Sequence, residues 1–167
     1  MELRGAIFEN GVDLIRVSRI LEKGFIRSAG IILIVTSLAK ILSAMGHAHM
    51  LEMPDPLFGV AFRYLMLLAG FLELVIGLFC LTETLVKFRL YLVVWIASCF
   101  LGYRIALWRI GWRHPCPCLG TWTDSLHLSA EAADSAMKLV LGYLLLGSLI
   151  VFFTSFISRR LRRDHGR

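Results

Sequence analysis

Four long apolar stretches dominate the pattern of hydrophobic and polar residues along the chain. They lie at about 28–46, 58–82, 88–109 and 137–157. Each has close to the ~20 residues that an α-helix needs to cross ~30 Å of hydrocarbon. None shows the strict alternation of apolar and polar residues that the strands of a membrane barrel require. The pattern therefore predicts an all-α integral membrane protein, a bundle of four transmembrane helices.

The segments outside these stretches divide the chain into three parts. Residues 1–27 are polar and charged, residues 28–157 contain all four spans, and residues 158–167 form a basic tail. In the first part, apolar residues such as Leu14 recur at helical spacing among basic residues such as Arg16, which predicts an amphipathic helix on an anionic cytoplasmic leaflet. An ordinary polar leader is the alternative. A cleaved secretory signal is not expected, because the apolar stretch starts only after these charged residues.

The distribution of Lys and Arg predicts how the bundle sits in the membrane. Five of these residues precede the first span, two (Lys87 and Arg89) lie between the second span and the start of the third, and five follow the fourth. The loop at 47–57 has none, and the loop at 110–136 has only Arg113. By the positive-inside rule, both termini are expected in the cytoplasm (N-in/C-in) and both of these loops outside. We expect a multi-pass protein of the bacterial inner (cytoplasmic) membrane, whose outer face is oxidising.

The composition agrees with a membrane protein and argues against a nucleic-acid partner. Apolar residues make up 57% of the chain and charged residues 18%. Lipid can cover that much apolar surface, whereas water cannot. The net charge of +6 comes mainly from the two ends of the chain, and no zinc-finger spacing or aromatic and basic RNA-binding pattern occurs. The expected surroundings are the lipid bilayer, and no nucleic acid is expected as a partner.

Charged residues inside the predicted spans are the first candidates for a special role. A charge in hydrocarbon costs at least ~2.5–3.5 kcal/mol, so it should face the bundle and find a partner. Counted from the inner ends of their antiparallel helices, Lys40 and Glu73 differ in depth by only about 5 Å. We therefore expect them to form a structural intramembrane pair, with a proton or ion pathway as the alternative. Arg63 and Arg104 lie near the outer ends of their spans and are expected to snorkel.

The most reactive residues lie in the segment 111–122, GWRHPCPCLGTW. A disulfide between Cys116 and Cys118 would close a very small ring, and the resulting strain would make the bond labile and oxidising. Positive charge from Arg113 or His114 would favour a thiolate, and Arg104 could add to it from the preceding helix. These features favour thiol–disulfide exchange, with Cys116 and Cys118 as the catalytic pair. Whether the protein is an enzyme is left open by the sequence.

Two other interpretations of this loop stay open. The two cysteines could be a structural link in a non-enzymatic assembly or accessory protein. Alternatively, His47, His49 and neighbouring methionines of the first outer loop could handle copper together with the cysteines, because thiolate, thioether and imidazole ligands suit that metal. No ligand set with four fixed positions occurs within one loop. We therefore assign no metal and no other cofactor, and neither copper nor a quinone has a supporting motif.

Several motifs, in this order, resemble those of a known family. They are GIILIVTSLAKIL in the first span, GFLELVIGL in the second, YRIALWRIGWRHPCPCLG at the end of the third and YLLLGS in the fourth. Over about residues 28–157 the chain resembles the DoxX-like superfamily, particularly its MauE branch of methylamine-utilisation proteins. The resemblance implies a redox-associated four-helix membrane bundle, similar in fold to thiol oxidoreductases of the vitamin K epoxide reductase type.

The same resemblance implies a role in forming or maturing disulfides of a periplasmic partner protein. Cys116 and Cys118 would then be the exchanging pair, and Lys40 and Glu73 the intramembrane charges of the family. The chain departs from the oxidoreductase pattern because it has CxC in place of CxxC. It also lacks a second outer pair of cysteines for relaying electrons, which argues against a quinone-coupled mechanism.

Overall fold

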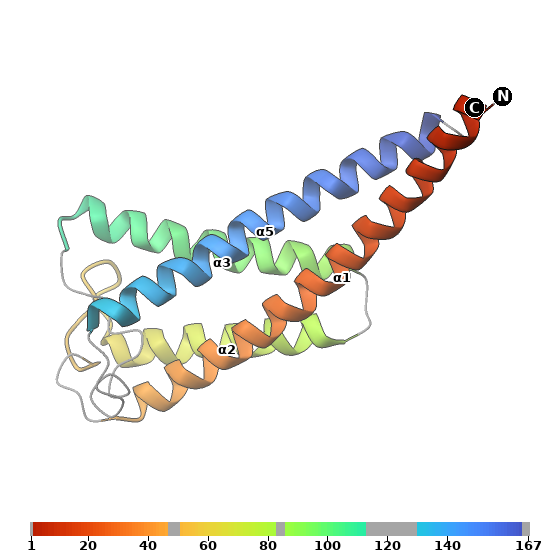
Figure 1. Cartoon of the computed structure of the whole chain (residues 1–167). Helices are drawn as coiled ribbons and strands as arrows, with labels where there is room; N and C mark the ends of the chain where they lie inside the picture. Colours follow the sequence, from red (N-terminus) through yellow and green to blue (C-terminus); the bar gives the residue numbers. More distant parts are fainter. Residues whose placement is uncertain (1, 47–50, 83–85, 113–129, 165–167) are drawn as a thin grey trace.

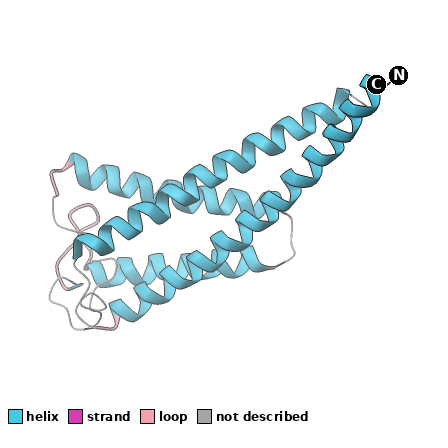
Figure 2. Ribbon diagram, viewed as in Figure 1, coloured by secondary structure: helices cyan, strands magenta, loops and turns pink. Residues whose placement is uncertain are grey.

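The computed structural model describes residues 2–46, 51–82, 86–112 and 130–164. Figure 1 shows four long helices: α1 (Glu2–Ala44), α2 (Phe62–Leu81), α3 (Val86–Arg109) and α5 (Ala130–Asp164). Within the described residues there are helices and loops but no strand, as Figure 2 shows. The all-α prediction is confirmed.

All four helices are long and apolar enough to cross a membrane. The candidate spans run over Arg16–Ala44, Phe62–Leu81, Val86–Arg109 and Asp134–Ile157. Many large apolar side chains lie exposed on the outside of the bundle, where a lipid bilayer would cover them. The chain is therefore a multi-pass membrane protein. The N-in/C-in orientation and the bacterial inner membrane stay predictions.

The first and last helices of the chain, α1 and α5, are longer than a bilayer requires. The predicted leader, 1–27, and the first span belong to one continuous helix from Glu2 onward. The fourth helix begins at Ala130, before the apolar stretch at 137–157, and continues to Asp164. The start of α1 and the end of α5 lie at the same end of the bundle (Figure 1). An even number of antiparallel spans produces this arrangement.

The second apolar stretch starts at residue 58, but α2 begins only at Phe62, because a turn precedes it. The Asp55 carboxylate accepts hydrogen bonds from the amides of Leu57 (2.8 Å) and Phe58 (2.9 Å), which is the pattern of an Asx turn. Gly59 has a φ of 67°, in the left-handed region that favours glycine. The Phe62 amide then donates to the Met53 carbonyl, 3.1 Å away, as α2 begins.

The helices α1 and α2 form the tightest pair, because glycines let their backbones approach. A Cβ on Gly77 would lie 2.8 Å from Cγ1 of Ile34, and one on Gly30 would lie 2.8 Å from Cβ of Cys80. The Ser37 hydroxyl donates to the Gly70 carbonyl of α2 over 2.8 Å. Small residues at such crossings are the usual basis of helix packing in membranes.

The helix α3 is fastened to the end of α2 by a buried arginine. One guanidinium nitrogen of Arg89 donates to the carbonyls of Cys80 (3.2 Å) and Thr82 (2.6 Å). Carbonyls at a helix C-terminus have no partner within the helix, and a cation there is also favoured by the helix dipole. Arg89 is one of the basic residues that predict the cytoplasmic side of the membrane. Its side chain is buried and links α3 to the end of α2.

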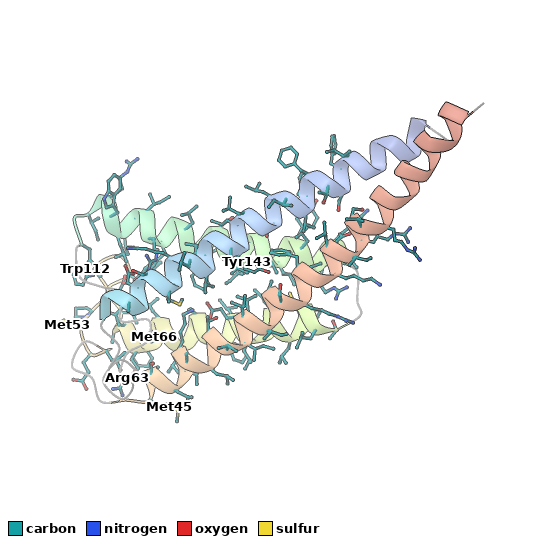
Figure 3. All side chains as sticks on the ribbon, viewed as in Figure 1. Met45, Met53, Arg63, Met66, Trp112 and Tyr143 are labelled. Atoms are coloured by element: carbon teal, nitrogen blue, oxygen red, sulfur yellow. The ribbon has the colours of Figure 1, made fainter. Side chains whose placement is uncertain are left out.

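The helix α5 packs against α1 and α3. Midway along it, the Tyr143 hydroxyl lies 2.6 Å from the Ser28 hydroxyl, and its ring lies 5.7 Å from that of Phe25. Gly147 makes room for the Phe25 ring, since a Cβ there would lie 2.1 Å from it. Figure 3 labels Tyr143 near the middle of α5, between α5 and α1. The main cluster of buried apolar residues draws on all four helices, and α1 and α3 contribute most of its members.

Candidate functional site

The residues predicted to carry redox or metal chemistry lie outside the described part of the chain. These are Arg113, His114, Cys116 and Cys118 of the second outer loop and His47 and His49 of the first. Their proposed roles therefore stay predictions. Among the residues that the structure describes, no three His, Cys, Asp or Glu side chains lie together as metal ligands would.

The structure brings Lys40 of α1 and Glu73 of α2 together as a buried ion pair. The ammonium donates to Oε1 of Glu73, and the two side chains are only 6% and 2% exposed. The Thr36 hydroxyl, one turn earlier on α1, lies 3.2 Å from Oε2 and donates to it. The Lys40 nitrogen also lies 4.9 Å from the centre of the Phe100 ring on α3. The pair thus joins three helices inside the membrane.

Local packing explains why these two charges meet. Gly70 lies one turn before Glu73, and a Cβ on it would stand 3.0 Å from Cγ1 of Ile41. Here the α1 and α2 backbones approach closely, and the Ser37–Gly70 hydrogen bond fixes their register. A long cation and a long anion on either side of this contact can then reach each other. Removing one partner of such a pair leaves an uncompensated buried charge, which costs about 3–5 kcal/mol.

The ion pair lines one side of an open cavity of about 340 Å³ that is lined by residues of all four helices. The rest of the lining is mostly apolar and includes five aromatic side chains: Phe58, Phe62, Trp95, Phe100 and Tyr103. Met66 also lines it and lies near the end of the bundle where Met53 and Trp112 are seen, away from the chain termini (Figure 3). A cavity of this size falls within the range that binds small organic molecules.

At the end of the bundle away from the chain termini, the cavity is bounded by two polar contacts of α3. The Tyr103 hydroxyl donates to Oδ2 of Asp55, and the Tyr103 ring stacks on that of Phe58 at 6.4 Å and 10°. The next residue, Arg104, donates to the Asp134 carboxylate of α5, which also pairs with Lys138 over 2.7 Å. Thus α3 holds both the segment before α2 and the beginning of α5.

Arg63 and Arg104, the two arginines that are expected to snorkel, both have polar partners in the structure. Arg104 is paired with Asp134 across the bundle, and a guanidinium nitrogen of Arg63 donates to the Gly46 carbonyl over 3.1 Å. Both side chains therefore fasten the outer ends of helices. The partner Asp134 was missed, although it lies four residues before Lys138 near the outer end of the fourth span. Asp55 lies between Pro54 and Pro56, and an aspartate between two prolines signals a turn.

The two cysteines within the spans have different surroundings. Cys80 is completely buried against Gly30 at the α1–α2 contact, as expected for a thiol that acts as a small apolar side chain. Cys99 on α3 is exposed and lines the cavity. Both are free thiols.

Comparison with known proteins identifies the group to which this arrangement belongs. No curated protein and no solved structure matches the chain. A family model described as methylamine utilisation protein MauE matches residues 24–141, from α1 into α5. The matched range contains the Lys40–Glu73 pair, the cavity-lining residues of α2 and α3, and both outer loops. The chain therefore belongs to the MauE family.

Proposed function

We propose that the chain exchanges disulfides with a periplasmic protein through Cys116 and Cys118. The MauE family is named for methylamine utilisation, and this is the setting in which we expect the chain to act. The observation that carries the proposal is the Cys-Pro-Cys sequence in the outer loop of a family member, next to Arg113 and His114. Such neighbours favour the thiolate, which is the attacking species in exchange.

The exchange transfers two electrons between the two cysteine pairs. In the reduced protein, the thiolate of Cys116 or Cys118 attacks one sulfur of a partner disulfide. A mixed disulfide forms, and the other partner sulfur leaves as a thiolate. The second cysteine then attacks the mixed disulfide, which leaves Cys116 and Cys118 oxidised and both partner thiols reduced. The reverse sequence starts from the oxidised pair and ends with a disulfide in the partner.

The bundle supplies a firm base for such a loop. The helix before it ends at Arg109 and the helix after it begins at Ala130. Near these ends, Arg104 and Asp134 form an ion pair between α3 and α5. This ion pair links the two helices to which the cysteine loop is attached.

The redox state of the cysteine pair tests the proposal. The full chain in native membranes is equilibrated with a series of glutathione ratios, and free thiols are alkylated and counted by mass spectrometry. A reversible Cys116–Cys118 disulfide with a midpoint potential above about −250 mV supports exchange. A pair locked below about −300 mV would mean a structural link, which contradicts the proposal.

Trapping of the mixed disulfide gives a second, independent test. Cys116→Ala and Cys118→Ala each remove one thiol of the pair, so in the variant that keeps the attacking thiol a partner should remain covalently attached and be released by reductant. Cys99→Ala is the matched control, because it removes a free thiol of the same chain without touching the loop. The same adducts in the Cys116→Ala, Cys118→Ala double variant would rule out exchange through this pair.

A further inference from the structure

The helices α1 and α5 extend beyond the other two at the end of the bundle that carries the chain termini (Figure 1). The last turn of α2 lies beside Gly30 of α1, because a Cβ on Gly30 would stand 2.8 Å from Cβ of Cys80. Residues 16–27 of α1 therefore lie beyond the end of α2. The helix α5 packs against α1 at Gly147, so its residues 150–157 run on beside this part of α1. These two segments together form a projecting arm.

Four basic side chains form a stripe on the α1 part of the projecting arm. They are spaced three or four residues apart, share one face of the helix and are all exposed: Arg16, Arg19, Lys23 and Arg27. Glu22 is the only acidic residue of this stretch, and it lies about 100° around the helix from Lys23. The basic stripe is about 16 Å long and attracts a partner of negative charge.

An apolar stripe runs beside the basic one and continues the lipid-facing side of the first span. Within the span this side consists of exposed apolar residues at helical spacing: Ile31, Val35, Leu38 and Leu42. Ile20 lies eleven residues, or about three turns, before Ile31 and therefore on the same side of α1. Val17 and Ile20 are 52% and 64% exposed. The α5 part of the arm also exposes large apolar side chains: Phe153, Phe156 and Ile157.

Charge and hydrophobicity together identify the partner that the projecting arm fits. A nucleic acid would cover the basic stripe but leave the apolar stripe in water. A second copy of the chain, related by a twofold axis, would place one basic stripe against another. A helix with a basic stripe beside an apolar one is typical of binding at the headgroup layer of an anionic membrane.

We infer that the projecting arm binds anionic phospholipids of the leaflet around this end of the bundle, with their phosphates against the basic stripe. The apolar stripe reaches the boundary between headgroups and acyl chains. From Val17 to Leu42 this stripe is about 37 Å long, and a stretch longer than ~30 Å of hydrocarbon is accommodated by tilting. In Figure 1, α1 runs obliquely to α2, as such a tilt requires. The inference does not depend on the chemistry of the cysteine loop.

Lipid preference is measured on the full chain by native mass spectrometry from detergent micelles. The probes are phosphatidylglycerol and phosphatidylcholine with identical acyl chains, offered together at equal concentration, so that only the headgroup charge differs. Each basic residue near an anionic surface strengthens binding about fivefold. We therefore expect phosphatidylglycerol to bind at least tenfold more tightly. Equal binding of the two lipids would overturn the inference.

Two charge-matched variants locate the bound lipid. Arg19→Gln with Lys23→Gln removes two exposed charges from the middle of the basic stripe, and it should reduce the preference to about threefold or less. The control, Arg109→Gln with Lys138→Gln, removes two exposed charges at the opposite end of the bundle and should leave the preference at tenfold or more. The same reduction in both variants, or none in the first, would refute binding at the arm.

Amide hydrogen exchange of the unaltered chain gives a measurement that does not depend on any variant. The full chain is placed in phosphatidylcholine nanodiscs with and without phosphatidylglycerol. Exchange at residues 16–27 should be about threefold slower or more with the anionic lipid, and exchange at residues 100–109 should not change. Equal exchange at residues 16–27 in both nanodiscs would contradict the inference. Slow exchange that requires two chains per nanodisc, whatever the lipid, would place a second copy on the arm and refute it.

Discussion

The buried ion pair between Lys40 and Glu73 makes the sharpest prediction about stability. Lys40→Met leaves the Glu73 carboxylate, only 2% exposed, with the Thr36 hydroxyl as its remaining donor. Glu73→Met leaves the ammonium without an anion. Each single change should lower the free energy of unfolding by about 3–5 kcal/mol, because an unpaired charge then stays buried.

The double variant should lose much less free energy of unfolding than the two single variants lose together. Lys40→Met with Glu73→Met places two apolar side chains of similar length where the ion pair was. Such replacements are often neutral or stabilising. We therefore expect the double variant to lose about 1 kcal/mol or less, although the single losses add up to about 6–10 kcal/mol.

Reversible unfolding of the full chain in mixed detergent micelles measures these differences by circular dichroism. The matched control is the Arg104–Asp134 pair, whose side chains are 25% and 18% exposed. Partial exposure should limit its coupling energy to about 1 kcal/mol. The reasoning is refuted if each single change at the buried pair costs less than about 1 kcal/mol, or if the double variant shows the full sum.

Two further predictions concern helix contacts outside this pair. Gly77→Ala should lower the free energy of unfolding by about 1–3 kcal/mol, because the added Cβ would stand 3.0 Å from the Gly30 carbonyl oxygen. Gly142→Ala, which meets nothing within 4 Å, should not destabilise, and an equal loss in both variants would contradict this explanation. Tyr103→Phe should cost about 1–2 kcal/mol, since Asp55 loses a donor. It should also speed amide hydrogen exchange at residues 55–62, and unchanged exchange would show that the hydroxyl does not hold this turn.

The spans and the Lys40–Glu73 ion pair could be predicted from the sequence because both follow from the number of residues along a helix. A helix rises a fixed ~1.5 Å per residue, so apolar runs of bilayer length are recognisable, and the depth of a charge can be counted from the end of its span. For Lys40 and Glu73 this count put the two charges at nearly the same level, and the structure joins them.

The contacts at the outer end of α3 depend on rotation, which the sequence does not reveal. A membrane helix that is apolar on all sides lacks the polar face that shows which side of a soluble helix points outward. Nothing in the sequence therefore indicated that Tyr103 faces Asp55 while Arg104 faces Asp134. The cavity was equally hidden, because residues of all four helices line it and the sequence does not give the spacing of the helices. The cysteine loop lies outside the described residues, so its predicted chemistry stays a prediction.

The helix α3 is held at both ends in a way that restricts how it can move. Tyr103 and Arg104 are consecutive residues, so their side chains leave the helix about 100° apart and reach different partners. At the opposite end, Arg89 binds carbonyls at the end of α2. A spin of α3 about its own axis would break these contacts, whereas a small tilt would strain them only slightly. Any widening of the cavity for a guest molecule should therefore come from tilting of α3, and that tilt would shift the start of the segment that carries the two outer cysteines.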